Sequence, residues 1–146
     1  MKSAPPEMPE GFGPLFRTSP LLETLGPFYG KGTGADLIIG LRVAEKHTNS
    51  RGTIHGGVLA TLGDIALGYA MAFSSAPPRR ALTASLSIDY VGSAKVGDWI
   101  EARVDKYKVG RTLAFANAYV TVDGAQIARV SAVFAVVQSE QQGPAA

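Results

Sequence analysis

The feature that most constrains this chain is a run of apolar and small residues from position 54 to 73. Between Gly52 and Pro78 the only formally charged residue is Asp64. A carboxylate at the centre of a membrane span costs about 2.5–3.5 kcal/mol, so a transmembrane helix is disfavoured. We therefore predict a helix over about residues 56–74, ended by Pro77 and Pro78 and buried on nearly every side.

Strand patterns dominate the rest of the chain. Residues 81–91 alternate strictly, which predicts Thr83 on the side opposite Leu82 and Leu86. The other predicted strands cover residues 36–43, 99–108, 112–122 and 126–137, with a tight hairpin at Asp123-Gly124 and the last strand in the sheet interior. Such a pattern indicates the α+β class, in which about five antiparallel strands curl around one helix. A helix this apolar also suggests that a second subunit helps to cover it.

Length and composition limit the function classes. The 146 residues predict a flexible Pro-rich arm (1–20), one folded domain (21–138) and a polar tail (139–146). The chain has no cysteine and two histidines, so thiolate chemistry is excluded and no metal or cofactor is expected. A net charge of +2 is too small to indicate nucleic-acid binding. No apolar signal segment follows Met1, so we expect a cytoplasmic protein with no membrane contact.

The start of the predicted helix could stabilise negative charge. Gly56 and Gly57 begin it, and the first N–H groups of a helix have no partners within the helix. With the helix dipole, these groups suit a developing oxyanion, and Asn49 and His55 add polar side chains nearby. Structural explanations stay open as well, since Asn is common in turns and a helix-start His often only hydrogen-bonds the backbone.

Asp64 is hard to explain without a function, because burying a carboxylate is costly. It follows His55 by nine residues, which is about 900° of rotation and roughly 13 Å along a helix. The two side chains would therefore point to opposite sides of the helix. If they share a site, the second member must come from a partner helix in a symmetric dimer.

The spacing of these residues closely resembles that of the hotdog-fold acyl-CoA thioesterases, and nearest to their PaaI-like (phenylacetate-pathway) branch. The shared pattern is Asn49-x2-Gly52-x2-His55-Gly56-Gly57, Leu62-x-Asp64, Tyr90 and Lys95-x-Gly97-Asp98, within residues 43–137. The resemblance implies one long central helix wrapped by a curled antiparallel sheet of five to six strands. It also implies a homodimer joined edge to edge, commonly paired into a homotetramer, and an acyl-CoA substrate.

The resemblance also implies roles for individual residues. Gly56 N–H would polarise the thioester carbonyl, with Asn49 close to that carbonyl or to the attacking water and His55 hydrogen-bonding nearby. Asp64 of the partner would act as general base or nucleophile, and Thr83, where Ser is familiar, would orient the water. The residues expected to line the coenzyme A path or to meet its phosphates are Gly57, Gly110, Arg111, Thr112, Arg79, Arg80, Lys106 and Lys108.

The leading hypothesis is therefore hydrolysis of an acyl- or aryl-acyl-CoA thioester by an activated water. The chain has no Gly-x-Ser-x-Gly elbow, so a serine-hydrolase mechanism lacks its signature. Two alternatives stay open: a hotdog hydroxyacyl-thioester dehydratase and a non-catalytic acyl-CoA-binding protein. Thiol release separates hydrolysis from both.

Overall fold

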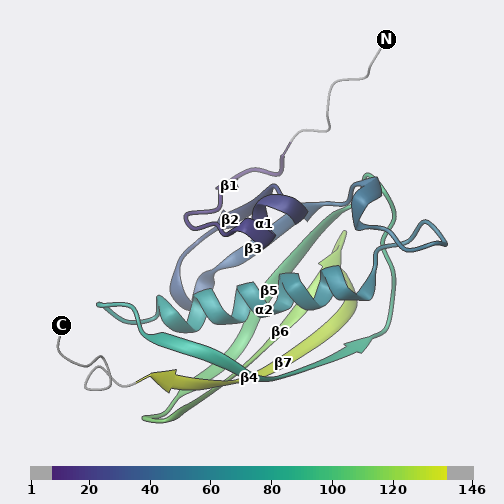
Figure 1. The fold of residues 1–146 in the computed structure, drawn as a ribbon. Coiled ribbons are helices and arrows are strands. Elements are labelled where there is room, and N and C mark those ends of the chain that lie inside the picture. The colour runs from purple at the N-terminus through teal and green to yellow at the C-terminus, as the bar shows by residue number, and fades with distance from the viewer. Residues whose placement is uncertain (1–7, 138–146) are drawn as a thin grey trace.

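Seven strands form one antiparallel sheet in the order β1-β2-β3-β5-β6-β7-β4 (Figure 1). The computed structural model describes residues 8–137. The strands are β1 (Gly13–Pro14), β2 (Phe28–Lys31), β3 (Ile38–Arg42), β4 (Arg80–Tyr90), β5 (Trp99–Val109), β6 (Leu113–Val122) and β7 (Ala125–Val137). The helical elements are α1 (Pro20–Leu25), α2 (Gly56–Ala72) and the short 3-10 turns η1 (Gly34–Asp36) and η2 (Glu45–His47).

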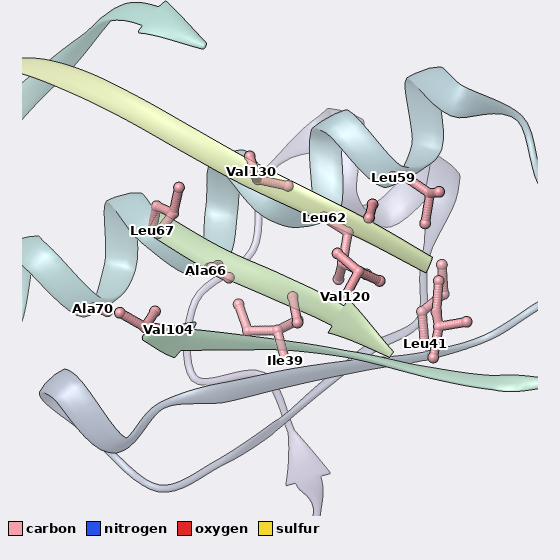
Figure 2. Packing of buried hydrophobic residues seen from close by; sticks show 14 of the residues in the cluster. Ile39, Leu41, Leu59, Leu62, Ala66, Leu67, Ala70, Val104, Val120 and Val130 are labelled. Carbon is pink, nitrogen blue, oxygen red and sulfur yellow. The ribbon is translucent and has the colours of Figure 1, made fainter. Parts of the chain in front are cut away.

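Helix α2 lies along one face of the sheet and forms the core with it (Figure 1). Figure 2 shows its apolar side chains facing those of β3, β5, β6 and β7. From the helix come Leu59, Leu62, Ala66, Leu67 and Ala70; from the sheet come Ile39, Leu41, Val104, Val120 and Val130. All are buried, as an almost uncharged helix requires. The predicted long buried helix and the α+β hotdog architecture are confirmed.

The sheet is larger than the five to six strands expected, because β1 and β2 add to it. Both are short, with two and four residues, and too short for a period of two to stand out. β1 falls within the expected N-terminal arm. In that segment Phe12 is buried, and its ring lies 5.1 Å from the Trp99 ring in an edge-on contact. The expected tail, residues 139–146, lies outside the described residues.

Strand β7 lies between β6 and β4, so its predicted interior position is confirmed. The predicted hairpin is also present, since Asp123 and Gly124 both have positive φ, at 49° and 78°. Two central residues with positive φ form the turn type whose twist matches that of the flanking strands. Among the described residues, no helix is long and apolar enough to cross a membrane.

The strict alternation predicted for β4 is wrong at one position. The pairing of β4 with β7 shifts between Thr83 and Ser85, which marks a bulge at Ala84. Thr83 therefore pairs with buried Phe134 and faces α2, whereas Leu82 lies on the opposite face and is 68% exposed. One extra residue reverses the side-chain alternation, and the sequence pattern does not predict it. The bulge brings Thr83 to the helix.

Candidate active site

The carboxylate of Asp64 meets the hydroxyl of Thr83. Thr83 Oγ1 donates a hydrogen bond of 2.8 Å to Asp64 Oδ1, joining the middle of α2 to β4. Within the described residues, no Lys or Arg nitrogen forms an ion pair with Asp64. A carboxylate that is not neutralised by a cation keeps its basicity available for a water or a substrate. The structure thus brings together two residues that were predicted separately.

A cavity of about 510 Å³ opens beside this pair. Volumes of several hundred Å³ are typical of small-molecule sites. One face of α2 lines it with Asp64, Ile65, Gly68, Tyr69 and Ala72, which follow one another at helical spacing. The other lining groups include Arg17, Thr18, Ser19, Arg79, Arg80, Thr83, Phe134 and Val137. Arg80, predicted to bind coenzyme A, therefore lies beside the same cavity as Asp64.

The start of α2 provides a second set of polar groups, besides the Asp64–Thr83 pair. His55 caps the helix, and its Nδ1 accepts a hydrogen bond of 2.8 Å from the Gly57 N–H. The Gly56 N–H donates to no backbone acceptor among the described residues, so it is free for a ligand oxygen. Gly57 N–H, by contrast, is used by the cap. The helix start therefore has one backbone donor, the Gly56 N–H, without a backbone acceptor among the described residues.

Tyr90 fixes the helix start from the sheet, a role that the sequence did not suggest. Its hydroxyl donates a hydrogen bond of 2.7 Å to the carbonyl oxygen of Gly56. A Cβ atom at position 56 would lie 2.9 Å from that hydroxyl, so only glycine fits there without displacing Tyr90. Buried His47 adds a second tie, because its carbonyl oxygen accepts from the His55 N–H at 2.8 Å.

Asn49 shapes the loop before α2. Its Oδ1 accepts hydrogen bonds from the Arg51 N–H at 2.9 Å and the Thr53 N–H at 3.3 Å, and its amide nitrogen donates to Thr53 Oγ1 at 3.0 Å. This is the turn role of Asn that stayed open in the sequence. Its predicted position beside a thioester carbonyl stays a prediction.

Two groups of predicted residues do not meet within one chain. Gly56 and Asp64 are eight residues apart, or about 12 Å along the helix axis. The hairpin of Gly110, Arg111 and Thr112 does not line the Asp64 cavity either. Lys106 and Lys108 instead line a groove of about 500 Å³ with Phe115, Asn117 and Ser131, on the face of the sheet away from α2.

The described residues contain no cluster of three or more His, Asp or Glu side chains that could hold a metal ion. At Asp64 the structure supplies a carboxylate with the Thr83 hydroxyl hydrogen-bonded to it. A carboxylate beside a hydroxyl, in a cavity, is suited to hold and deprotonate a water.

Comparison with known proteins agrees with this architecture. A family model described as the thioesterase superfamily matches residues 51–128. A Pseudomonas aeruginosa protein described as a candidate esterase is 48% identical over 128 residues, which cover 87% of this chain and 96% of that protein. Acyl-coenzyme A thioesterase 13 of Mus musculus is 38% identical over 86 residues, covering 58% of this chain and 60% of that protein.

Among solved structures, a mutant of the phenylacetic acid degradation protein PaaI from Thermus thermophilus superposes with a TM-score of 0.73. It is 24% identical, and the match covers 82% of this chain and all of that one. At this identity the likeness concerns the fold, one long helix packed on a curled antiparallel sheet, which is the hotdog fold. Taken with the family match and the 48% identical relative, the chain belongs to the thioesterase superfamily. It is a thioester hydrolase.

Proposed function

We propose that the protein hydrolyses an acyl-CoA or aryl-acyl-CoA thioester at two equivalent sites in the interface of a homodimer. The observation that carries this proposal is the Asp64–Thr83 pair, held at 2.8 Å beside a cavity of about 510 Å³, where no Lys or Arg of residues 8–137 forms an ion pair with the carboxylate. Water bound by the pair attacks the thioester carbonyl carbon while Asp64 takes its proton. As the C–S bond breaks, the proton passes to the leaving thiolate of coenzyme A.

The carbonyl oxygen needs a donor, and the free Gly56 N–H at the start of α2 is suited to it. Within one chain that donor is about 12 Å from Asp64 along the helix axis. A thioester held by Asp64 therefore needs the helix start of another subunit. In this scheme, Asn49 and His55 of that subunit also lie beside the substrate.

The exposed edge of β4 supports the way in which the two subunits meet. β4 is the last strand of the sheet, eleven residues long, and residues 81–88 carry no charge. Long uncharged edge strands readily pair with a strand of another chain. Two copies of β4 can pair antiparallel about a two-fold axis and join the sheets edge to edge.

The contacts of β4 fit this arrangement. Thr83 binds Asp64 near one end of the strand, and Tyr90 binds the helix start near the other end. In a two-fold antiparallel pair, residues opposite each other point to the same face of the sheet. An axis at Ser87 pairs Leu86 with Ile88, and with the bulged Ala84 left unpaired it sets Thr83 of one subunit opposite Tyr90 of the other. Asp64 of one subunit then lies beside Gly56 of its partner.

The proposal also includes the path of coenzyme A and the pairing of two dimers into a homotetramer. The pantetheine arm passes along the dimer surface near Gly57 and the Gly110, Arg111 and Thr112 hairpin, and the phosphates meet basic residues outside the Asp64 cavity, such as Lys108. We further propose a homotetramer in the cytoplasm. The groove on the face of the sheet away from α2, with Phe115 exposed at 51%, supports contact between two dimers.

Thiol release from a panel of acyl-CoA substrates tests the proposal. We expect free coenzyme A with a matching carboxylic acid, with kcat/KM differing among short, medium and aryl acyl groups. An enoyl product without free thiol from a hydroxyacyl-CoA would instead show a dehydratase. Binding without turnover of any substrate would show a non-catalytic acyl-CoA-binding protein.

A further inference from the structure

The cavity beside Asp64 carries an unusual charge distribution. Three arginines line it, Arg17, Arg79 and Arg80, against the single acidic residue Asp64. An anionic ligand group is therefore attracted to the cavity, and its low-dielectric walls focus this field. The question is which part of an acyl-CoA brings the negative charge.

Tyr69 lies about one and a half turns further along α2 and lines the same cavity. Its ring packs against those of Phe16 and Phe73, with centroid distances of 5.5 Å and 6.4 Å. Its hydroxyl forms no hydrogen bond with the other described residues, and burial raises the pKa of Tyr69 above its usual value, although Arg17 opposes this shift. Tyr69 is therefore a protonated donor at neutral pH, oriented by aromatic contacts and without a partner.

Arg17 lies beside Tyr69 on a segment that is anchored to the body of the protein. The Leu15 N–H donates to the Phe28 carbonyl at 3.3 Å, and the Phe16 ring packs edge-on against Phe73 at 4.9 Å. Ser19 then caps α1. Among the described residues, no carboxylate forms an ion pair with Arg17. The cavity is thus lined by a cation and a hydroxyl donor, neither of which has an ion-pair or hydrogen-bond partner in the described part of the chain.

Distance along the helix identifies the ligand group. Tyr69 follows Asp64 by five residues, or about 7.5 Å along the axis. A medium-length acyl chain spans that distance when its thioester lies at Asp64. The coenzyme A phosphates are separated from the thioester by the whole pantetheine arm, which is much longer. The anion that reaches Arg17 and Tyr69 therefore belongs to the acyl group.

We propose that Arg17 and Tyr69 select acyl groups that end in a carboxylate, so that the substrate class is the coenzyme A monothioesters of medium-length dicarboxylic acids. This inference rests on the proposed function. A terminal carboxylate accepts charge-assisted hydrogen bonds from both groups. A purely apolar chain would desolvate them without offering an acceptor, and this asymmetry is a strong source of discrimination.

The test compares adipoyl-CoA with hexanoyl-CoA, which have the same chain length and differ in the terminal carboxylate. For the unmodified protein we expect kcat/KM for adipoyl-CoA to exceed that for hexanoyl-CoA about tenfold. Arg17→Gln should lower the adipoyl-CoA value about fivefold, since the arginine is exposed at the cavity mouth, and leave the hexanoyl-CoA value nearly unchanged. Arg17→Lys should retain most of the preference.

Two further variants complete the test. Tyr69→Phe keeps the ring contacts with Phe16 and Phe73 and should reduce only the adipoyl-CoA value. Arg103→Gln removes the same charge on an exposed side chain that pairs with Glu101 outside the cavity, and should change neither value. Each variant is checked by its melting temperature.

The outcomes separate the two proposals. Equal hydrolysis of both substrates by the unmodified protein, or an equal loss on both in Arg17→Gln, would overturn the carboxylate preference and leave the thioesterase proposal intact. A preference for 6-hydroxyhexanoyl-CoA over adipoyl-CoA would also overturn it, in favour of a neutral polar terminus. Absence of thiol release from every substrate would overturn both.

Discussion

The chemistry attributed to Asp64 depends on one carboxylate oxygen that accepts from Thr83, with no ion pair to a Lys or Arg among the described residues. Asp64→Asn keeps the shape and a hydrogen-bond acceptor but removes the base. We expect kcat for thiol release to fall about 10²–10⁴-fold, the usual contribution of general-base catalysis. Acyl-CoA binding and the melting temperature should change little.

The matched control is Asp105→Asn. Asp105 is exposed and receives only a weak contact of 3.4 Å from the Asn117 amide. It lies outside the Asp64 cavity, so the same chemical change there should leave kcat unaltered. A kcat for Asp64→Asn close to that of the control would rule out Asp64 as base or nucleophile.

Substitutions of Thr83 test whether its hydroxyl positions the Asp64 carboxylate. Removing its hydroxyl in Thr83→Ala takes away the hydrogen bond of 2.8 Å to Asp64. A hydrogen bond to a charged group is worth about 1.5–3 kcal/mol, so we expect kcat to fall about tenfold or more. Thr83→Ser restores the hydroxyl and should restore most of the rate. If alanine and serine behaved alike, the hydroxyl would have no part in catalysis.

At the level of elements, the contact between α2 and β7 depends on a glycine. A Cβ atom at Gly63 would lie 2.7 Å from Val130 Cγ2, whereas one at Gly68 would lie at an ordinary 3.7 Å from the Phe134 ring. Both substitutions with alanine gain the same helix propensity, about 1 kcal/mol. Only Gly63→Ala overpacks the core, at a cost of about 1–3 kcal/mol.

Urea denaturation of the two variants measures this difference directly, because the propensity gain cancels between them. We expect Gly68→Ala to be at least as stable as the unmodified protein and Gly63→Ala to unfold at lower urea. The same free energy of unfolding for both would mean that α2 shifts freely on the sheet.

Strand β4 carries the proposed dimer contact, and a charge on its exposed edge should weaken it. Ser87 and Ser131 pair across β4 and β7, and both are exposed, so Ser87→Lys and Ser131→Lys are a matched pair. Near a two-fold axis, the two lysine side chains introduced at position 87 would repel each other, whereas position 131 lies one strand further in. Sedimentation velocity should show about a tenfold weaker dimer for Ser87→Lys only. Equal behaviour of the two would argue against pairing through β4.

The long elements could be predicted from the sequence because their signals are repeated many times. The apolar run around Asp64 predicted α2, and the Asp123-Gly124 turn fixed the hairpin into β7. The position of Thr83 could not be predicted, because one bulged residue reverses an alternation that is otherwise regular. Strand β2 was missed for a different reason: four residues contain too little periodicity.

The candidate site could be predicted in part, because some of its residues stand out in their local sequence. Asp64 and the helix start are unusual in their local sequence, so each could be recognised alone. The contacts of Tyr90 with Gly56, and of Arg17 with the cavity, join positions far apart in the chain. Only the folded sheet and the anchored segment before α1 bring them together. A single sequence contains no signal for such contacts.

For the whole molecule, the central question is whether one active site needs two subunits. Two variants that we expect to be strongly impaired answer it. Asp64→Asn removes the base, and the double variant Asn49→Ala/His55→Ser alters the helix start while keeping a good capping residue. Coexpression with two different affinity tags and sequential purification isolates the mixed oligomer.

If Asp64 acts with the helix start of its partner, each mixed dimer has one site with both defects and one intact site. The purified mixed dimer should then show about half of the unmodified activity, well above that of either parent variant. If instead each site were built within one chain, every site in the mixed dimer would carry a defect, and thiol release would stay at the level of the parents. Because the eight residues between Gly56 and Asp64 separate them by about 12 Å, we expect recovery.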